Sequence, residues 1–171
     1  MRRAILAAAA VFGCLSADRG PVDWAFWGGD PGGTHYSTLT EINTSNVAQL
    51  SQAWIWKTGE TELKEYGTRP GMFENTPVML DGVVYATSPY NRVVALDPET
   101  GAELWTYDPK SYVDGQPPNG TGYVHRGIAL WRDSRDGNKP RIYLNTRYRL
   151  ISIDAKSGNR LRPSATTVWS I

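Results

Sequence analysis

The chain has a single cysteine and no excess of either charge. One cysteine, Cys14, cannot form an intrachain disulfide, so the stability of the fold must come from packing. Lysine and arginine number 18 against 17 aspartate and glutamate. A nucleic-acid-binding protein would be expected to carry a basic stripe, so the composition gives no case for a nucleic-acid partner. Phenylalanine is also scarce, with three residues, whereas the chain has seven tryptophans, nine tyrosines, 17 glycines and 11 prolines. This profile is typical of many short strands joined by turns.

The apolar run at the start of the chain is too short to span a bilayer. It extends from Ala4 to Gly13 and follows two arginines, which is the pattern of an export signal. We therefore expect residues 1–17 to be a signal peptide and the protein to be periplasmic. Residues 11–14 loosely resemble a lipoprotein box, in which case Cys14 would carry a lipid anchor. Cleavage after Ala17 would instead remove this cysteine, and both alternatives stay open.

Short apolar segments alternate with turn signals from residue 75 onward. The first four strands are expected at 76–80, 83–87, 92–96 and 102–107. Asp81-Gly82 is a hairpin turn between the first two. Four short antiparallel strands in about 34 residues form one blade of a β-propeller. Upstream of them we expect a short helix, capped by Thr44 or Ser45 and ending at Leu50, and a strand at 53–60.

A second set of strands is expected at 126–131, 141–145 and 149–153. It follows a long excursion rich in proline, glycine and asparagine, residues 108–124, and such loops in repeat proteins usually lie on the functional face. Residues 161–171 fit no fourth strand. The predicted fold class is therefore all-β: a partial β-propeller of about one and a half four-stranded blades, with one short N-terminal helix.

The sequence ALDPETGAELW, from Ala95 to Trp105, has a partial copy 57 residues later, SIDAKSGNRLR. In the first copy Asp97 can accept hydrogen bonds from the amides of its own turn, and Gly101 can adopt a positive φ. Trp105 would then point out of its sheet and cover the neighbouring blade. In the second copy Arg162 takes the place of the tryptophan.

These segments together resemble the pyrroloquinoline quinone (PQQ)-dependent alcohol and sugar dehydrogenases, the quinoproteins. The resemblance covers Asp23 to about Gly158. It rests on the opening DWAFWGGDPGGTHYSTL, on the segments ENTP and HRGIALW, and on the docking pattern A-x-D-x-x-T-G-x-x-x-W. It is closest to the glucose-dehydrogenase side of the family. Methanol-dehydrogenase relatives carry adjacent cysteines shortly before the Arg-Gly pair, and residues 122–125 here are Gly-Tyr-Val-His.

The resemblance implies an eight-bladed propeller with PQQ and a calcium ion in the central channel. It implies oxidation of a glucose-like sugar or an alcohol by hydride transfer to the quinone, with cytochrome c or ubiquinone as electron acceptor. It also implies three cofactor-binding residues, Glu74, Arg126 and Thr146. A guanidinium suits a flat polyanion, and a hydroxyl can donate to a carboxylate. The alternatives are a solvated strand end for Glu74, a loop ion pair for Arg126 and an ordinary turn residue for Thr146. His125 and His35 are interpreted as structural.

The family's catalytic aspartate and calcium ligands come from later blades, so we assign no catalytic residue and no metal site here. We expect the chain to be an N-terminal fragment that is itself inactive and only marginally stable. Residues 161–171 are expected to be out of frame, because GC-rich codons read two bases later restore a family-like segment. A cofactor-free scaffold propeller, of the outer-membrane assembly lipoprotein type, is the alternative. A glycan- or peptide-binding propeller is a third possibility.

Overall fold

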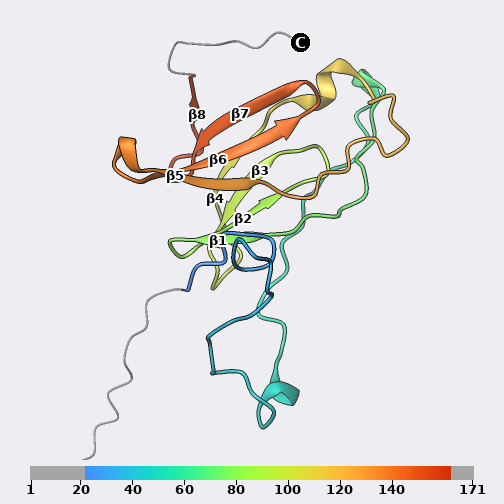
Figure 1. Ribbon diagram of the computed structural model, residues 1–171. Coiled ribbons are helices and arrows are strands. Elements are labelled where there is room, and N and C mark those ends of the chain that lie inside the picture. Colours follow the sequence, from blue (N-terminus) through green and yellow to red (C-terminus); the bar gives the residue numbers. More distant parts are fainter. Residues whose placement is uncertain (1–21, 163–171) are drawn as a thin grey trace, which may run out of the picture.

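The computed structural model describes residues 22–162, which form two four-stranded antiparallel sheets connected by long loops (Figure 1). In both sheets the strands follow one another in sequence order. The first sheet consists of β1 (Val78–Leu80), β2 (Val83–Thr87), β3 (Val93–Leu96) and β4 (Glu103–Tyr107). The second consists of β5 (Ala129–Asp133), β6 (Lys139–Thr146), β7 (Arg149–Asp154) and β8 (Arg160–Leu161). The predicted all-β, partial-propeller fold is confirmed.

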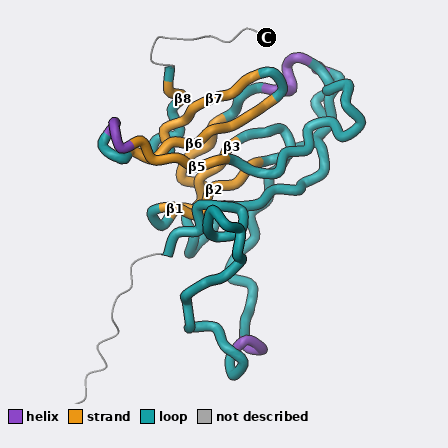
Figure 2. Tube along the Cα trace, in the orientation of Figure 1, coloured by secondary structure: helices purple, strands orange, loops and turns teal. Residues whose placement is uncertain are grey.

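Loops make up most of the remaining described chain (Figure 2). Four short 3-10 turns interrupt them: η1 (Val47–Gln49), η2 (Lys64–Tyr66), η3 (Ser111–Asp114) and η4 (Ser134–Asp136). Figure 1 shows the segment before β1 extending away from the sheets, with η1 near its far end. Between residues 22 and 162, no helix has the length and apolarity needed to cross a membrane. The expected signal peptide with Cys14, and residues 163–171, lie outside the described part of the chain.

The expected N-terminal helix is reduced to the single 3-10 turn η1. Neither Thr44 nor Ser45 caps it, because Asn46 occupies the N-cap and its side chain makes no capping bond. The Asn46 amide group is already used: its oxygen accepts from the amide of Asn43, and its nitrogen donates to the carbonyl of Glu41. Local side-chain bonds of this kind compete with helix formation, which explains why the helix does not extend.

The strand expected at 53–60 is also wrong, although the segment is extended. Its side chains alternate as a strand would, with Trp54 and Trp56 half-buried and Ile55 64% exposed. Among the described residues no strand pairs with it. Its contacts with the first sheet are made by indoles instead: Trp54 Nε1 donates to the carbonyl of Pro98 at 2.9 Å, and Trp56 Nε1 donates to Glu103 at 2.8 Å.

The second sheet has a fourth strand, which the sequence pattern did not predict. It is β8, only two residues long, with Arg160 opposite Ile153 and Leu161 opposite Ser152 on β7. Two residues carry no alternating apolar pattern, so periodicity could not detect this strand. The described chain therefore contains two four-stranded units in place of one and a half.

Both copies of the repeated turn have the same geometry. Asp97 Oδ1 accepts hydrogen bonds from the amides of Glu99 and Thr100 and from the Thr100 hydroxyl. Asp154 Oδ1 accepts the equivalent three bonds, two from amides and one from the Ser157 hydroxyl. A glycine with φ of 71° or 72° ends each turn. The Asx-turn mechanism read from the sequence is confirmed in both places.

A tryptophan from the preceding part of the chain packs on each of these turns. A Cβ placed on Gly158 would lie 2.6 Å from the ring of Trp105, and a Cβ on Gly101 would lie 2.6 Å from the ring of Trp54. Trp105 Nε1 also donates to the carbonyl of Ala155 at 3.2 Å. Trp105 therefore covers the neighbouring sheet, as expected. Trp54 makes the same contact one unit earlier, which explains its place in the extended segment.

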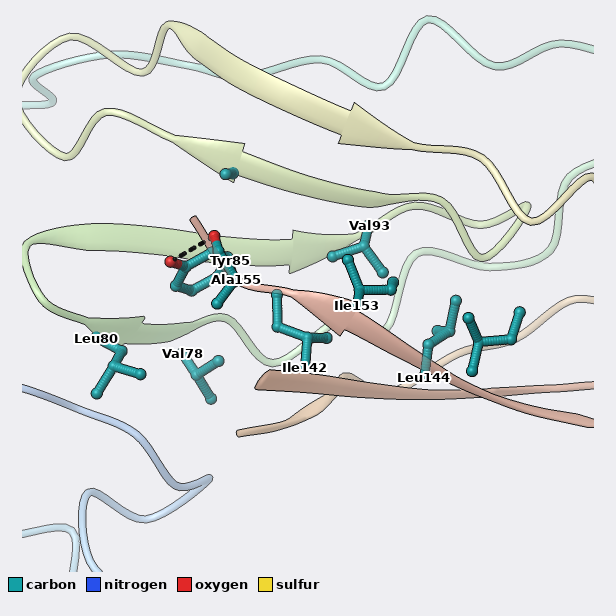
Figure 3. Close-up of a cluster of buried hydrophobic side chains, with 10 residues drawn as sticks. Val78, Leu80, Tyr85, Val93, Ile142, Leu144, Ile153 and Ala155 are labelled. Atoms are coloured by element: carbon teal, nitrogen blue, oxygen red, sulfur yellow. Dashed lines mark hydrogen bonds between the residues drawn. The ribbon is translucent and has the colours of Figure 1, made fainter. Parts of the chain in front are cut away.

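The core lies between the two sheets, where their apolar faces meet (Figure 3). The buried members are Val78, Leu80, Tyr85, Val93 and Ala95 from the first sheet and Ile142, Leu144, Ile151, Ile153 and Ala155 from the second sheet and its turn. One polar group crosses this core: the Tyr85 hydroxyl donates to the carbonyl of Ala155 at 3.1 Å. Burial, assisted by the charge of Asp81, raises the pKa of Tyr85 to about 12.

Candidate functional site

A pocket of about 620 Å³ lies where the segments leading into β1 and β5 meet the end of β6. This volume is within the usual range of small-molecule sites. Its lining includes Trp27, Thr76, Thr121, Arg126, Ile128 and Asn145. Polar groups and one cation thus face an opening that both sheets help to form.

Arg126 and Glu74, two of the three predicted site residues, are brought together at this pocket. Arg126 Nε lies 3.2 Å from Glu74 Oε2 in an ion pair. The arginine side chain is 82% exposed and the glutamate side chain 32%. An exposed ion pair contributes little to stability, on the order of 0–1 kcal/mol. Its clearer effect is on position: the pair keeps the charged Arg126 side chain beside the pocket, where it stays open to solvent.

The backbone on either side of Arg126 is fixed by contacts that explain the sequence His-Arg-Gly. The amide of Thr76 donates to the carbonyl of Arg126 at 3.0 Å, which ties this turn to the segment entering β1. Gly127 has a φ of 140°, and a Cβ at this position would lie 3.0 Å from the carbonyl oxygen of Thr76. A residue with a side chain would be strained there. Glycine therefore allows the close approach of the two segments.

His125, the residue before Arg126, is 9% exposed, lines the pocket and takes part in three polar contacts. Its Nε2 lies 2.9 Å from the carbonyl of Asn145, and its Nδ1 lies 3.2 Å from the Thr87 hydroxyl. The amide of Gly127 donates to Nδ1 at 3.2 Å. Burial lowers the pKa of His125 below its usual value. These contacts agree with the structural role expected for this histidine.

Thr146, the third predicted residue, lies close to the pocket in sequence but faces away from it. It follows the pocket-lining Asn145 on β6, and successive strand residues point to opposite faces. The residue is 2% exposed, and its hydroxyl donates to Asn91 Oδ1 at 2.8 Å and contacts the Ser111 hydroxyl at 2.5 Å. Its role as a cofactor ligand stays a prediction, and in this arrangement its hydroxyl is already engaged.

Four polar or aromatic pocket residues were not recognised from the sequence: Trp27, Thr76, Thr121 and Asn145. Trp27 is 66% exposed and packs on the edge of His35, with ring centroids 4.5 Å apart. The glycine-rich opening supports it, because a Cβ on Gly28 would lie 2.4 Å from the Cα of Gly33. The sequence feature that could have identified Trp27 is a large aromatic residue within a stretch too rich in glycine to form a helix or strand.

The residues at the pocket fit a planar anion and offer no metal centre. Arg126 supplies a permanent positive charge, and Thr76 and Asn145 supply neutral polar groups. Within residues 22–162, His, Cys, Asp and Glu form no group of three that could hold a metal ion.

Comparison with known proteins gives a consistent family. The chain is 35% identical, over 159 residues, to the dehydrogenase subunit of the quinone alcohol dehydrogenase of Gluconobacter oxydans. It is 36% identical, over 146 residues, to the quinohemoprotein alcohol dehydrogenase of Comamonas testosteroni. These alignments cover 91% and 81% of this chain but 18% of each relative, so the chain spans about a fifth of their length.

Solved structures agree with the sequence relatives. The quinohemoprotein alcohol dehydrogenase ADHIIG of Pseudomonas putida superposes with a TM-score of 0.61 at 31% identity, over 84% of this chain and 19% of that one. A europium-containing methanol dehydrogenase gives a TM-score of 0.61 at 26% identity, over 85% and 23%. Residues 24–164 match the family model for the PQQ-dependent glucose, ethanol and alcohol dehydrogenase β-propeller domain. The chain therefore belongs to the PQQ-dependent dehydrogenase propeller family.

Proposed function

We propose that this chain supplies the first two blades of an exported PQQ-dependent alcohol dehydrogenase, and that its pocket binds part of the quinone cofactor. The observation that carries the proposal is the position of Arg126. Its side chain is 82% exposed, forms an ion pair with Glu74 and lines a pocket formed by both sheets. The same pocket presents an exposed indole, Trp27.

The chemistry of the cofactor suits these groups. PQQ is a flat ring with three carboxylates, and when bound it accepts the hydride removed from the substrate. Arginine keeps its charge at every physiological pH and presents a planar set of donors that matches carboxylates and quinone oxygens. Glu74 accepts a hydrogen bond from Arg126 Nε at 3.2 Å and leaves the other guanidinium nitrogens for the cofactor, and Trp27 offers an apolar face. The Thr146 hydroxyl would bind the cofactor only if it gave up its contacts with Asn91 and Ser111. We assign no catalytic base and no calcium ligand in this chain.

The substrate is proposed to be an alcohol in preference to a sugar. The relatives described above are named as alcohol dehydrogenases, and others carry names such as 1-butanol dehydrogenase (cytochrome c). These names also support a quinone or a cytochrome c as the electron acceptor, and ubiquinone is the quinone proposed. Export to the periplasm rests on residues 1–17. Mass spectrometry of the protein recovered from a periplasmic extract would show whether cleavage keeps or removes Cys14.

A binding experiment tests the role of Arg126. PQQ would be titrated with calcium into the 171-residue chain and into Arg126→Gln, with calorimetry as the readout. The loss of a charge-assisted contact of about 1.5–3 kcal/mol should weaken binding by roughly tenfold or more. Arg132→Gln is the matched control, because Arg132 forms a surface ion pair with Asp81 and does not line this pocket.

Two outcomes would contradict the proposal. If the chain does not bind PQQ, the pocket formed by these two sheets is not a cofactor site by itself, and the role proposed for Arg126 is wrong. If both arginine variants lose affinity equally, the effect is one of overall charge and Arg126 has no special role.

A further inference from the structure

We infer that His125 is a positioning residue: its neutral ring holds the backbone of residues 125–127 so that Arg126 points into the pocket. The inference rests on the proposed function for the identity of the ligand that Arg126 binds. It goes beyond that function, because His125 is assigned an action on the arginine and not a contact with the cofactor.

The hydrogen bonds determine which form of the ring is present. The carbonyl of Asn145, 2.9 Å from Nε2, can only accept, so Nε2 must carry a proton. The amide of Gly127, 3.2 Å from Nδ1, can only donate, so Nδ1 must be unprotonated. The Thr87 hydroxyl near Nδ1 already donates to Asn75 Oδ1 at 2.8 Å. The two backbone bonds are satisfied together only by neutral imidazole with its proton on Nε2. In this form the Thr87 hydroxyl, which donates to Asn75, lies beside Nδ1 without a hydrogen bond to it.

Those bonds join the two ends of the turn that carries the arginine. One side of the ring is anchored to β6 through Asn145, and the other side binds Gly127, the residue that directly follows Arg126. Gly127 has a φ of 140° and lies against the carbonyl of Thr76. Loss of the acceptor at Nδ1 would leave the Gly127 amide without this partner, and the backbone on one side of Arg126 would be released.

Protonation of His125 would remove that acceptor. With a proton on Nδ1 the ring would point a donor at the Gly127 amide, which is itself a donor. The groups that face the ring are Thr87 on β2 and the Asn145 carbonyl on β6, and neither titrates. The charged neighbours are Arg126 on the same turn and Glu74, its ion-pair partner. Burial favours the neutral ring, and it holds the pKa of His125 below the ordinary value of 6.5.

The pH dependence of PQQ affinity tests this inference. Affinity would be measured between about pH 4.5 and 7.5 for the wild-type chain, His125→Asn and His35→Asn. In the wild type the affinity should fall about tenfold as the pH drops through the pKa of His125. Asparagine places an uncharged acceptor near the position of Nδ1, so His125→Asn should bind with an affinity that varies less than about twofold over the same range. His35 is the chain's other histidine, and it packs on Trp27. The control is therefore the pH dependence alone, which in His35→Asn should match the wild type whatever its absolute affinity.

The controls separate this inference from the proposed function. Protonation of PQQ itself would affect all three proteins equally. An unchanged pH dependence in His125→Asn, or a flattened one in His35→Asn, would overturn the role of His125. If PQQ does not bind at any pH, the proposed function fails, and ¹⁵N NMR then decides the positioning role. The Gly127 amide and Arg126 Nε resonances of the wild type should shift together with the His125 ring titration. If they do not, the inference is wrong, and this readout needs no variant to fold.

Discussion

Replacement of Gly158 by alanine should detach Trp105 from the turn on which it packs. Gly158 has a φ of 72°, and an added Cβ would lie 2.6 Å from the indole of Trp105. The positive φ alone should cost about 1 kcal/mol. Displacement of the ring should add about 1 kcal/mol for the lost bond to the Ala155 carbonyl. It should add about 1 kcal/mol more for the contact with Tyr85, whose ring centroid lies 5.9 Å away.

The chain offers a matched control in another turn of the second sheet, between β5 and β6. Gly137 has a φ of 61°, and an added Cβ would meet no atom within 4 Å. Gly137→Ala should therefore lower the free energy of unfolding by about 1 kcal/mol, through backbone strain alone. Gly158→Ala should lower it by about 3 kcal/mol, so the difference of about 2 kcal/mol measures the docking contact.

Urea unfolding followed by tryptophan fluorescence and far-ultraviolet circular dichroism would measure both variants. With a slope of about 2 kcal/mol per molar urea, the midpoint of Gly158→Ala should lie about 1 M below that of Gly137→Ala. If the chain is only marginally stable, a stabilising osmolyte added equally to all samples would raise the free energy of unfolding of each protein enough to measure it. Equal midpoints for the two variants would refute the idea that the indole contact stabilises the packing of the two sheets.

Three further results are expected. Tyr85→Phe should cost about 1 kcal/mol for the lost bond to Ala155. Folding raises the pKa of the Tyr85 phenol to about 12, so the stability of the wild type should fall as the pH rises above 10. Thermal melts at high pH should show a smaller fall in melting temperature for Tyr85→Phe. The hydrogen bond from the Thr100 hydroxyl lowers the pKa of Asp97, so the ionised Asp97 side chain stabilises the fold above pH 3.8, and this stabilisation is lost as the pH falls. Acid titration of Asp97→Asn should therefore show a smaller loss of stability than the wild type. An identical acid profile would contradict this. PQQ should quench the fluorescence of pocket-lining Trp27, so Trp27→Phe should lose much of the quenching, whereas Trp131→Phe, outside the pocket, should keep it.

The strands of the first sheet could be predicted from the sequence because several local signals agree. Asp81 and Gly82 have φ values of 52° and 74°, as a tight hairpin turn requires, and the apolar runs on either side of them pair in register. The two repeated turns were predictable for the same reason, since an aspartate, a hydroxyl residue and a glycine specify the bonds within a few residues.

Features that depend on distant partners could not be predicted. The segment 53–60 alternates like a strand, but its tryptophans pack on residues more than 40 positions away, and a pattern cannot tell indole docking from backbone pairing. Thr146 and Asn145 are both polar, so alternation on β6 did not indicate which of them faces the pocket. The partners of Thr146, Asn91 and Ser111, come from two other loops. Arg126 and Glu74 were found because a family resemblance marked them, not because their spacing indicates a site.

The direction of the tryptophan contacts has a consequence for synthesis on the ribosome. In both units the indole precedes the turn that receives it: Trp54 lies before Gly101, and Trp105 lies before Gly158. A chain made from its N-terminus therefore already contains each indole when the receiving turn leaves the exit tunnel. The first sheet can dock on the segment before it, and the second sheet on the first, without waiting for later sequence, which shortens the time that their apolar faces are open to aggregation.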